Sequence, residues 1–217
     1  MSAPHTHRDL IRRALATSAP SVVQAGAGEP PGESGEGDEH DPLVIANRSQ
    51  GKRPREAGVL VPLVEREAGL NLILTRRSEH LPTHAGQISF PGGSQDPDDR
   101  DAVDTALREA EEEIGLQRRL VDIAGSLDRY ETGTGFILNP VVGFVDPAFT
   151  PRADPGEVAE VFEVPLAFVL DPANHQRMTA VRDGRRRRFF AMTYETYFIW
   201  GATAGVIIDL QRRLEDL

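Results

Sequence analysis

The sequence predicts an α/β protein in which helices cover both faces of a mixed β-sheet. Apolar segments typical of strands are interspersed with segments whose apolar residues recur at helical spacing, and this order favours an α/β/α sandwich. A chain of 217 residues, of which 39% are hydrophobic, is long enough to bury one sizeable core. We therefore expect one main domain, residues 55–217, preceded by an N-terminal extension, residues 1–54.

The extension divides into a short helix and a loop. His7–Thr17 has apolar residues at helical spacing, which predicts the helix. Ala25–Asp41 is rich in Gly, Pro and Glu, a composition that buries little apolar surface and is typical of a flexible loop.

The main domain begins with two apolar segments that predict a β-hairpin. Val59–Val64 and Leu70–Thr75 are separated by the turn-like Glu65–Gly69. Further strands are expected at Gln87–Phe90, Leu120–Leu127, Phe136–Val145, Val158–Val164, Phe189–Tyr194 and Tyr197–Trp200.

Three helices are predicted among these strands. Ala102–Gly115 has a stripe of small and apolar residues at helical spacing, and its glycine is a common helix end. Pro165–Leu170 begins with a proline, whose fixed φ suits a first helical turn. Ala202–Leu214 closes the domain with an apolar face, which is also a candidate homodimer interface.

The helix predicted at Ala102–Gly115 carries the pattern that bears on function. Glu109, Glu112 and Glu113 stand at positions i, i+3 and i+4, so a helix places them on one face. Three carboxylates on one face repel one another unless a cation lies between them. Oxygen ligands suit a hard divalent ion such as Mg²⁺ or Mn²⁺, which also binds phosphate oxygens. The pattern indicates metal-assisted chemistry on a phosphorylated substrate, with a solvated acidic face as the alternative.

The residues before this helix form a turn and a cap. Phe90-Pro91-Gly92-Gly93 ends an apolar run in a glycine turn. Asp96–Asp99 supplies side-chain acceptors for the free N–H groups of a helix start. The unit is thus a strand, a Gly-rich loop and an acidic helix.

This unit, Gly92–Leu116, resembles the Nudix box, Gly-x5-Glu-x7-Arg-Glu-U-x-Glu-Glu-x-Gly-U, in which U is a bulky apolar residue. The second half matches from Arg108 onward. In the first half the position of the Glu holds Arg100, and a one-residue expansion of the loop, Gly93-x5-Asp99, restores the pattern. The resemblance implies the Nudix α/β/α sandwich and hydrolysis of a nucleoside diphosphate linked to another moiety.

The same resemblance implies roles for the residues of the box. Glu109, Glu112 and Glu113 are expected to bind Mg²⁺ or Mn²⁺, and Glu112 and Glu113 are also candidates to orient the attacking water. Arg108 is expected to pair with a neighbouring carboxylate and hold its rotamer, with an ordinary surface arginine as the alternative.

A base or a fourth metal ligand often comes from outside the box in this family. Glu157, in a loop just before a predicted strand, is the first candidate, and Glu160 is the second. A plain loop carboxylate is the alternative for Glu157. The backbone of Gly92 and Gly93 is expected to approach the metal and the phosphates closely.

A second resemblance concerns the substrate. Ile73–Gly93 is similar to the signature of coenzyme A pyrophosphatases, L-L-T-x-T-[S/A]-x3-R-x3-G-x3-F-P-G-G. Within it, Arg77 replaces a Thr, and Pro82 replaces the Arg. Since a cation at the latter position would contact nucleotide phosphates, Arg76 and Arg77 are the candidates to compensate.

Two later segments leave alternatives open. The basic run Arg185–Arg188 follows a hairpin-turn signal and is either a solvated loop or a site for the 3′-phosphate of coenzyme A. Four aromatic residues either belong to the core or stack on adenine. They are Tyr194, Tyr197, Phe198 and Trp200.

Composition narrows the classes of function. A net charge of −10 argues against non-specific nucleic-acid binding, and the absence of cysteine excludes thiol catalysis and disulfides. No apolar run approaches a membrane span, and the N-terminus has no apolar signal region, so cytoplasmic residence is expected.

The functional hypothesis is metal-dependent hydrolysis of a small nucleotide. Coenzyme A or an acyl-CoA, split into 3′,5′-ADP and (acyl) phosphopantetheine, is the substrate that the second resemblance implies. ADP-ribose, NADH or another nucleotide is the alternative within the class. A Nudix-fold module that senses a nucleotide without cleaving it is the alternative of another class.

Overall fold

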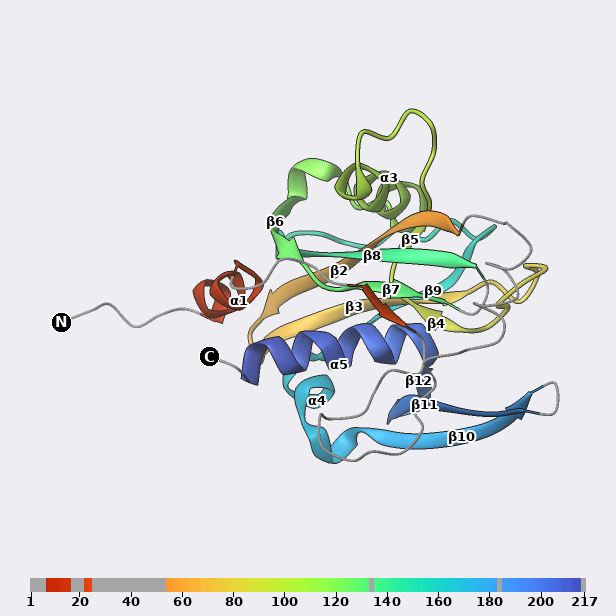
Figure 1. The fold of residues 1–217 in the computed structure, drawn as a ribbon. Coiled ribbons are helices and arrows are strands. Elements are labelled where there is room, and N and C mark those ends of the chain that lie inside the picture. Colours follow the sequence, from red (N-terminus) through yellow and green to blue (C-terminus); the bar gives the residue numbers. More distant parts are fainter. Residues whose placement is uncertain (1–6, 17–21, 25–53, 133–134, 183–184, 216–217) are drawn as a thin grey trace.

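A large mixed sheet lies between helices on its two sides (Figure 1). The computed structural model describes residues 7–16, 22–24, 54–132, 135–182 and 185–215. The helices are α1 (His7–Ala16), α3 (Ala102–Ile114), α4 (Leu166–Leu170) and α5 (Gly201–Glu215), with 3-10 turns η1 (Arg118–Leu120) and η2 (Pro172–Asn174). In Figure 1, α3 lies above the sheet and α5 below it, which confirms the predicted α/β/α sandwich.

Nine strands form the large sheet within the described residues. The long strand β2 pairs antiparallel with β3 and parallel with β8, so the sheet is mixed, as predicted. Its strands are β1 (Val22–Gln24), β2 (Arg55–Arg66), β3 (Gly69–Arg77), β4 (Ile88–Ser89), β5 (Gly92–Ser94), β6 (Val121–Ser126), β7 (Arg129–Glu131), β8 (Phe136–Val145) and β9 (Val158–Pro165).

A second, smaller sheet follows in the chain. It is antiparallel, in the order β10 (Gln176–Arg182), β11 (Arg185–Tyr194) and β12 (Tyr197–Trp200). The β10–β11 hairpin projects from the body below α5 (Figure 1).

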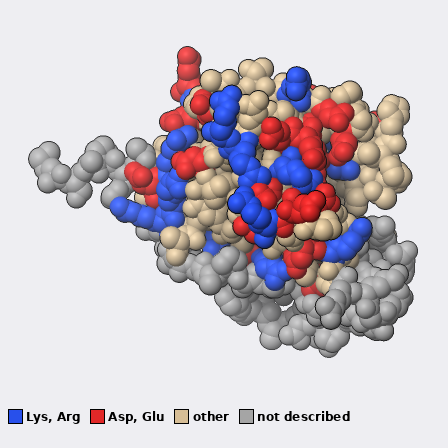
Figure 2. Space-filling model, turned by 90° about the horizontal axis from the view of Figure 1, so that it is seen from above, with Lys and Arg blue, Asp and Glu red and all other residues tan. Residues whose placement is uncertain are grey.

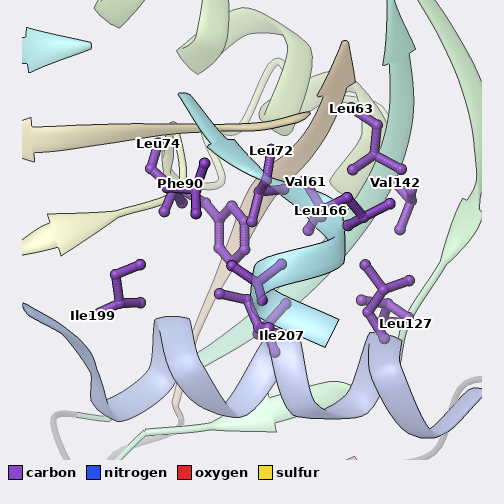
Figure 3. Packing of buried hydrophobic residues seen from close by; sticks show 14 of the residues in the cluster. Val61, Leu63, Leu72, Leu74, Phe90, Leu127, Val142, Leu166, Ile199 and Ile207 are labelled. Carbon is purple, nitrogen blue, oxygen red and sulfur yellow. The ribbon is translucent and has the colours of Figure 1, made fainter. Parts of the chain in front are cut away.

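The alternation of β2 divides the core into two clusters. Val61 and Leu63 are fully buried in the cluster that also contains Ile207 of α5. Leu60 is fully buried in the other cluster, with Ala110 of α3. Successive side chains of a strand point to opposite faces, so one strand serves both layers. Figure 3 shows the first cluster, which packs above α5.

Glycine allows α3 to lie unusually close to the sheet. A Cβ atom on Gly58 of β2 would lie 2.5 Å from the carbonyl oxygen of Ala102 and 2.7 Å from Cβ of Thr105. Any larger residue would push the helix away, because real Cβ atoms do not approach so closely. The acidic helix is therefore held directly against β2.

Two sequence predictions are corrected by the backbone. The strand predicted at Gln87–Phe90 is confirmed but shorter, as β4 (Ile88–Ser89), and after Pro91 the predicted glycine turn is instead the short strand β5, which pairs with β2. Proline lacks an N–H for a strand ladder, and Gly92 turns the chain with a φ of 154°. Pro165 ends β9 with a ψ of 128°, so α4 starts at Leu166 and not at the proline.

The predicted hairpin is confirmed, and its strands are longer than expected. Strands β1, β5, β7 and β10 were not predicted. Strands β1, β5 and β7 have three residues each, too few for a pattern, and the described side chains of β10 form no buried face. None of the helices in the described part of the chain combines the length and apolarity needed to cross a membrane.

Helix α1 of the predicted extension packs on the domain. Its Ile11 and Leu15 are buried in the cluster that contains α5, and Arg12 donates to the carbonyl oxygen of Ile123 at 2.8 Å. The helix thus belongs to the same core as the domain. The predicted loop Ala25–Asp41 lies outside the described residues, and the boundary at residue 54 stays a prediction.

Candidate active site

Helix α3 begins and ends with recognised cap chemistry. Asp101 is the N-cap, and its side chain accepts a hydrogen bond from the N–H of Asp104 at 2.8 Å. Gly115 ends the helix in the left-handed conformation, with a φ of 70°. The cap predicted within Asp96–Asp99 is therefore corrected to Asp101, and these loop residues are free for other contacts.

Arg108 is the centre of an ion-pair network that joins this loop to the helix. Its guanidinium binds Asp99 with two hydrogen bonds, of 3.0 and 2.9 Å. Its Nη1 donates to Glu109 at 2.9 Å and to Glu112 at 3.0 Å, and its Nη2 donates to the carbonyl oxygen of Ser94 at 3.1 Å.

These contacts confirm the expected pairing of Arg108 with a neighbouring carboxylate, and they show what Asp99 does. The hydrogen bonds from Arg108 lower the pKa of Asp99 to about 2, and the same contact raises the pKa of Arg108. Asp99 therefore stays ionised and fixes the arginine. The expanded loop thus returns a carboxylate to the position that the box requires.

The glycine pair packs directly against the carboxylates of α3. A Cβ atom on Gly93 would lie 2.5 Å from the carboxyl carbon of Glu109. The N–H of Gly92 donates to Oε2 of Glu113 at 3.2 Å, and a Cβ atom on Gly92 would meet the carbonyl oxygen of Gly58 at 2.5 Å. Both positions require glycine because of these protein contacts, and the expected approach to the metal and the phosphates stays a prediction.

Glu113 is the unusual charged group of the site. Its side chain is only 3% exposed. Burial raises the pKa of Glu113 to about 8, and the Gly92 N–H and Arg77 oppose this rise. Burial also raises the pKa of Glu109. A perturbed carboxyl pair beside a Gly-rich loop is a frequent mark of a functional site.

Arg77 approaches Glu113 from strand β3. Its Nη1 lies 3.8 Å from Oε1 of Glu113, a distance too long for a hydrogen bond. Its Nε is buried and, among the described residues, has no hydrogen-bond partner. A buried N–H without an acceptor costs free energy, so an acceptor atom that reached Nε of Arg77 would stabilise this side chain.

Arg76, the neighbour of Arg77, takes different partners. It pairs with Glu160 at 3.1 Å, and Glu160 also accepts the hydroxyl of Tyr197 at 2.7 Å. Strand β12, which carries Tyr197, and helix α3 lie on opposite sides of the large sheet (Figure 1). The register of β3 and β9 shifts between the two arginines, a β-bulge of the kind that re-aims side chains near sites.

The loop that carries Glu157 is fastened to the end of α3. The N–H of Asp154 donates to the carbonyl oxygen of Glu113 at 2.9 Å, and the N–H of Ser78 donates to that of Glu157 at 2.8 Å. The charge of Glu157 is a minor contribution to the raised pKa of Glu113 and of Glu109. Of the two candidates outside the box, Glu157 is in the loop bonded to the end of α3, whereas Glu160 pairs with Arg76.

The donor set fits a hard divalent cation, although it is not arranged as a finished site. In the described part of the chain, no three His, Asp, Glu or Cys side chains are grouped as a metal centre. Glu109 and Glu112 are instead turned toward Arg108. The buried Glu113 has only the distant Arg77 as counter-charge, and oxygen-only donors beside it suit Mg²⁺ or Mn²⁺. Figure 2, seen from the side of α3, shows acidic and basic side chains intermixed on this face.

The four aromatic residues divide between core and surface. Tyr194 and Tyr197 are partly buried and pack against the core, where Tyr197 stacks on Phe162 with ring centroids 3.7 Å apart. Phe198 and Trp200 are exposed. The structure does not describe the side chains of Arg185, Arg186 and Arg187, so the two alternatives for the basic run stay open.

Comparison with known proteins places the chain in a family. A family profile described as the NUDIX domain matches residues 53–183. A protein of Escherichia coli K12, named uncharacterized Nudix hydrolase NudL, is 44% identical over 156 residues, which is 72% of this chain and 81% of that protein. A protein of the same name from Shigella boydii serotype 18 is 43% identical over 156 residues, with the same coverage of both chains.

A solved structure agrees in fold. The MutT/nudix family protein of Enterococcus faecalis has a TM-score of 0.50 and 14% identity, and the match covers 82% of this chain and 71% of that one. The chain therefore belongs to the Nudix hydrolases. It is accordingly an enzyme that acts on the pyrophosphate bond of nucleoside diphosphate derivatives, and enzymes of this family generally use divalent metal ions.

Proposed function

We propose that this protein hydrolyses coenzyme A or an acyl-CoA, with Mg²⁺ or Mn²⁺, to 3′,5′-ADP and (acyl) phosphopantetheine. The observation that carries the hydrolytic site is the buried Glu113, which faces the Gly92 N–H on one side and Arg77 on the other. The choice of coenzyme A is supported by the resemblance of Ile73–Gly93 to the coenzyme A pyrophosphatase signature.

The carboxylates of α3 supply the metal ligands in this proposal. Glu109, Glu112 and Glu113 would hold Mg²⁺ or Mn²⁺, and a cation bound there would neutralise charge on the pyrophosphate and lower the pKa of a water. For this, Glu109 and Glu112 leave their hydrogen bonds with Arg108 in part. Arg108 keeps its two hydrogen bonds to Asp99, so its guanidinium stays in place to orient the carboxylates of Glu109 and Glu112.

The remaining groups bind phosphate and move the proton. The buried Nε of Arg77 is directed to a phosphate oxygen, which provides the acceptor that it lacks. The lack of side chains at Gly92 and Gly93 lets the β5 backbone pack against Glu109 and Glu113, which holds these carboxylates in place. Glu157 accepts the proton of the attacking water as the bridging P–O bond breaks. Arg76 pairs with Glu160 on the opposite side of the sheet, so of the two arginines the proposal assigns phosphate binding to Arg77.

Product analysis tests the substrate. The protein is incubated with Mg²⁺ or Mn²⁺ and equimolar coenzyme A, acetyl-CoA, ADP-ribose, NADH and dinucleoside polyphosphates, and products are separated by chromatography and weighed by mass spectrometry. Preferential release of 3′,5′-ADP is the expected result. Preference for another compound would keep the hydrolase and discard the coenzyme A assignment. Binding without turnover of any compound would support a nucleotide-sensing module.

A further inference from the structure

The three-stranded sheet β10–β12 carries an unusual share of the exposed apolar surface. Among the described residues, five large hydrophobic side chains are exposed. Four of them are on this sheet: Met178, Val181, Phe198 and Trp200. The fifth, Leu10, is on α1. Scattered exposed hydrophobics are ordinary, but a cluster on one element marks a contact surface.

The strand register places most of this cluster on one face. Met178 lies opposite Phe189, Trp200 opposite Ala191, and Phe198 opposite Thr193. The three partners on β11 are Phe189, Ala191 and Thr193, which are two residues apart. Their side chains, and those of the residues opposite them, therefore point to the same face of the sheet. Phe189 and Trp200 are also in edge-to-face contact, with centroids 5.5 Å apart. We call Met178, Phe189, Phe198 and Trp200 the outer face.

The opposite face of this sheet is already used. Met192 and Ile199 are fully buried in the cluster that contains α5. The apolar residues of α5 are buried in the same cluster, Ile207 and Leu210 completely. The apolar face of α5 is therefore satisfied within one chain, and an interface with another molecule must use a different surface, such as the outer face.

Charge indicates the kind of partner. Gln176–Arg188, which includes β10 and the hairpin turn, contains six arginines and one acidic residue in the sequence. The rest of the chain contains 33 of its 34 acidic residues and 18 of its 24 basic ones. A basic arm on an acidic body complements a second copy of the same chain, since opposite potentials attract and steer association.

We propose that the outer face packs against the outer face of a second copy, as a two-fold dimer. Such an interface is isologous, so both copies use the same patch. In an antiparallel arrangement, strand β10 of each copy lies beside the acidic body of the other. Strand β10 is an edge of its sheet in the described pairings, so the arm has no neighbouring strand on its outer side.

A matched pair of variants tests the surface. Met178 and Leu10 are both 37% exposed, but only Met178 belongs to the outer face. Wild type, Met178→Glu and Leu10→Glu are compared by analytical ultracentrifugation, with circular dichroism as the control for folding. A charge placed in an apolar interface should raise the dissociation constant of the dimer at least about tenfold in Met178→Glu, and Leu10→Glu should match wild type.

The single tryptophan gives an independent reading. The chain has one Trp, at position 200, so its fluorescence reports on the outer face alone. On dilution, the emission of Trp200 should shift to longer wavelength and its quenching by acrylamide should increase. If Trp200 is buried to the same extent at all protein concentrations, residues of the same chain bury it, and the proposal is overturned.

The outcomes separate this proposal from the catalytic one, because neither measurement requires metal or substrate. A wild type that stays monomeric up to roughly 100 μM would overturn the dimer, since specific interfaces of standard size bind more tightly. Equal weakening by Met178→Glu and Leu10→Glu would overturn the choice of surface. Because salt screens charge, the dissociation constant should rise between about 0.1 and 1 M NaCl, and a fall would contradict the acidic partner surface.

Discussion

The two helical layers that cover the large sheet are built on opposite principles. On the side of α5, Ile207 and Leu210 are fully buried among apolar neighbours. On the side of α3, the buried set includes the carboxylate of Glu113, with a pKa raised to about 8 by its burial. Burying a charge without a close partner costs stability. The first layer stabilises the fold, and the second buries an ionisable group whose charged form is destabilising in the absence of a close cation.

The largest effect expected from this difference is on turnover. Glu112→Gln removes a proposed metal ligand from an exposed position, so the fold should be intact. We expect kcat to fall on the order of 10³-fold, as for other groups that act on developing charge. The measurement is the rate of 3′,5′-ADP release at saturating metal. Glu111→Gln is the matched control, since Glu111 is an exposed neighbour on the same helix. Near-normal turnover of Glu112→Gln would refute the metal assignment.

On the side of α5, the large effect should be on stability instead. Ile207→Ala leaves a cavity in a fully buried position, which costs about 3 kcal/mol of unfolding free energy. Urea unfolding followed by circular dichroism measures the loss. Turnover per folded molecule should change little, because Ile207 touches none of the groups of the site. Equal losses of stability and of turnover would contradict the division of labour between the two layers.

The features of the α3 layer that depend on residues close in the sequence could be predicted from the sequence. The register of α3 follows from periodicity, and its acidic face follows from positions i, i+3 and i+4, so Glu109, Glu112 and Glu113 were identified from the sequence. The loop position of Glu157 directly before β9 was also predicted, and its catalytic role stays a prediction. These features depend on neighbours within a few turns of the chain.

Features that depend on distant contacts could not be predicted. Strand alternation alone puts the adjacent Arg76 and Arg77 on opposite faces of the sheet, but their partners, Glu160 and Glu113, come from elements that are distant in the sequence. The pairing of Asp99 with Arg108 required the loop geometry, since the sequence shows only that the loop has one extra residue. The unpredicted strand β10 lacks a buried face, so no hydrophobic pattern marks it.

The pairing of Asp99 with Arg108 should contribute moderately to stability and to turnover. Asp99→Asn keeps the size of the side chain and removes the charge that fixes Arg108. We expect a loss of about 1 kcal/mol of unfolding free energy and a decrease in kcat of about 10- to 100-fold, as for a group that orients a metal ligand. Denaturant unfolding and steady-state kinetics test both. A variant with normal kinetics would leave Arg108 without a positioning role.

The same pair should show itself at low pH. The folded pKa of Asp99, about 2, is below the ordinary 3.8 of the unfolded chain, so the folded state binds fewer protons between these values. Its contribution is therefore present above about pH 4 and is lost as the pH falls toward 2. The difference in stability between wild type and Asp99→Asn should shrink over this range. A constant difference would mean that the ion pair does not hold the carboxylate ionised.

Glu113 should give a pH dependence of the opposite sign in the metal-free protein. Its folded pKa of about 8 is above the ordinary 4.5, so the folded state binds more protons than the unfolded chain between these values. In the presence of a chelator, stability should therefore decrease as the pH rises from about 5.5 to 8, on the order of 1 kcal/mol, and Glu113→Gln should lack this decrease. Adding Mg²⁺ or Mn²⁺ should remove the decrease in wild type alone, because a bound cation favours the ionised carboxylate. The buried charge that weakens the α3 layer would then be the charge that binds the metal, whereas a decrease that persists in Glu113→Gln would assign the instability to another group.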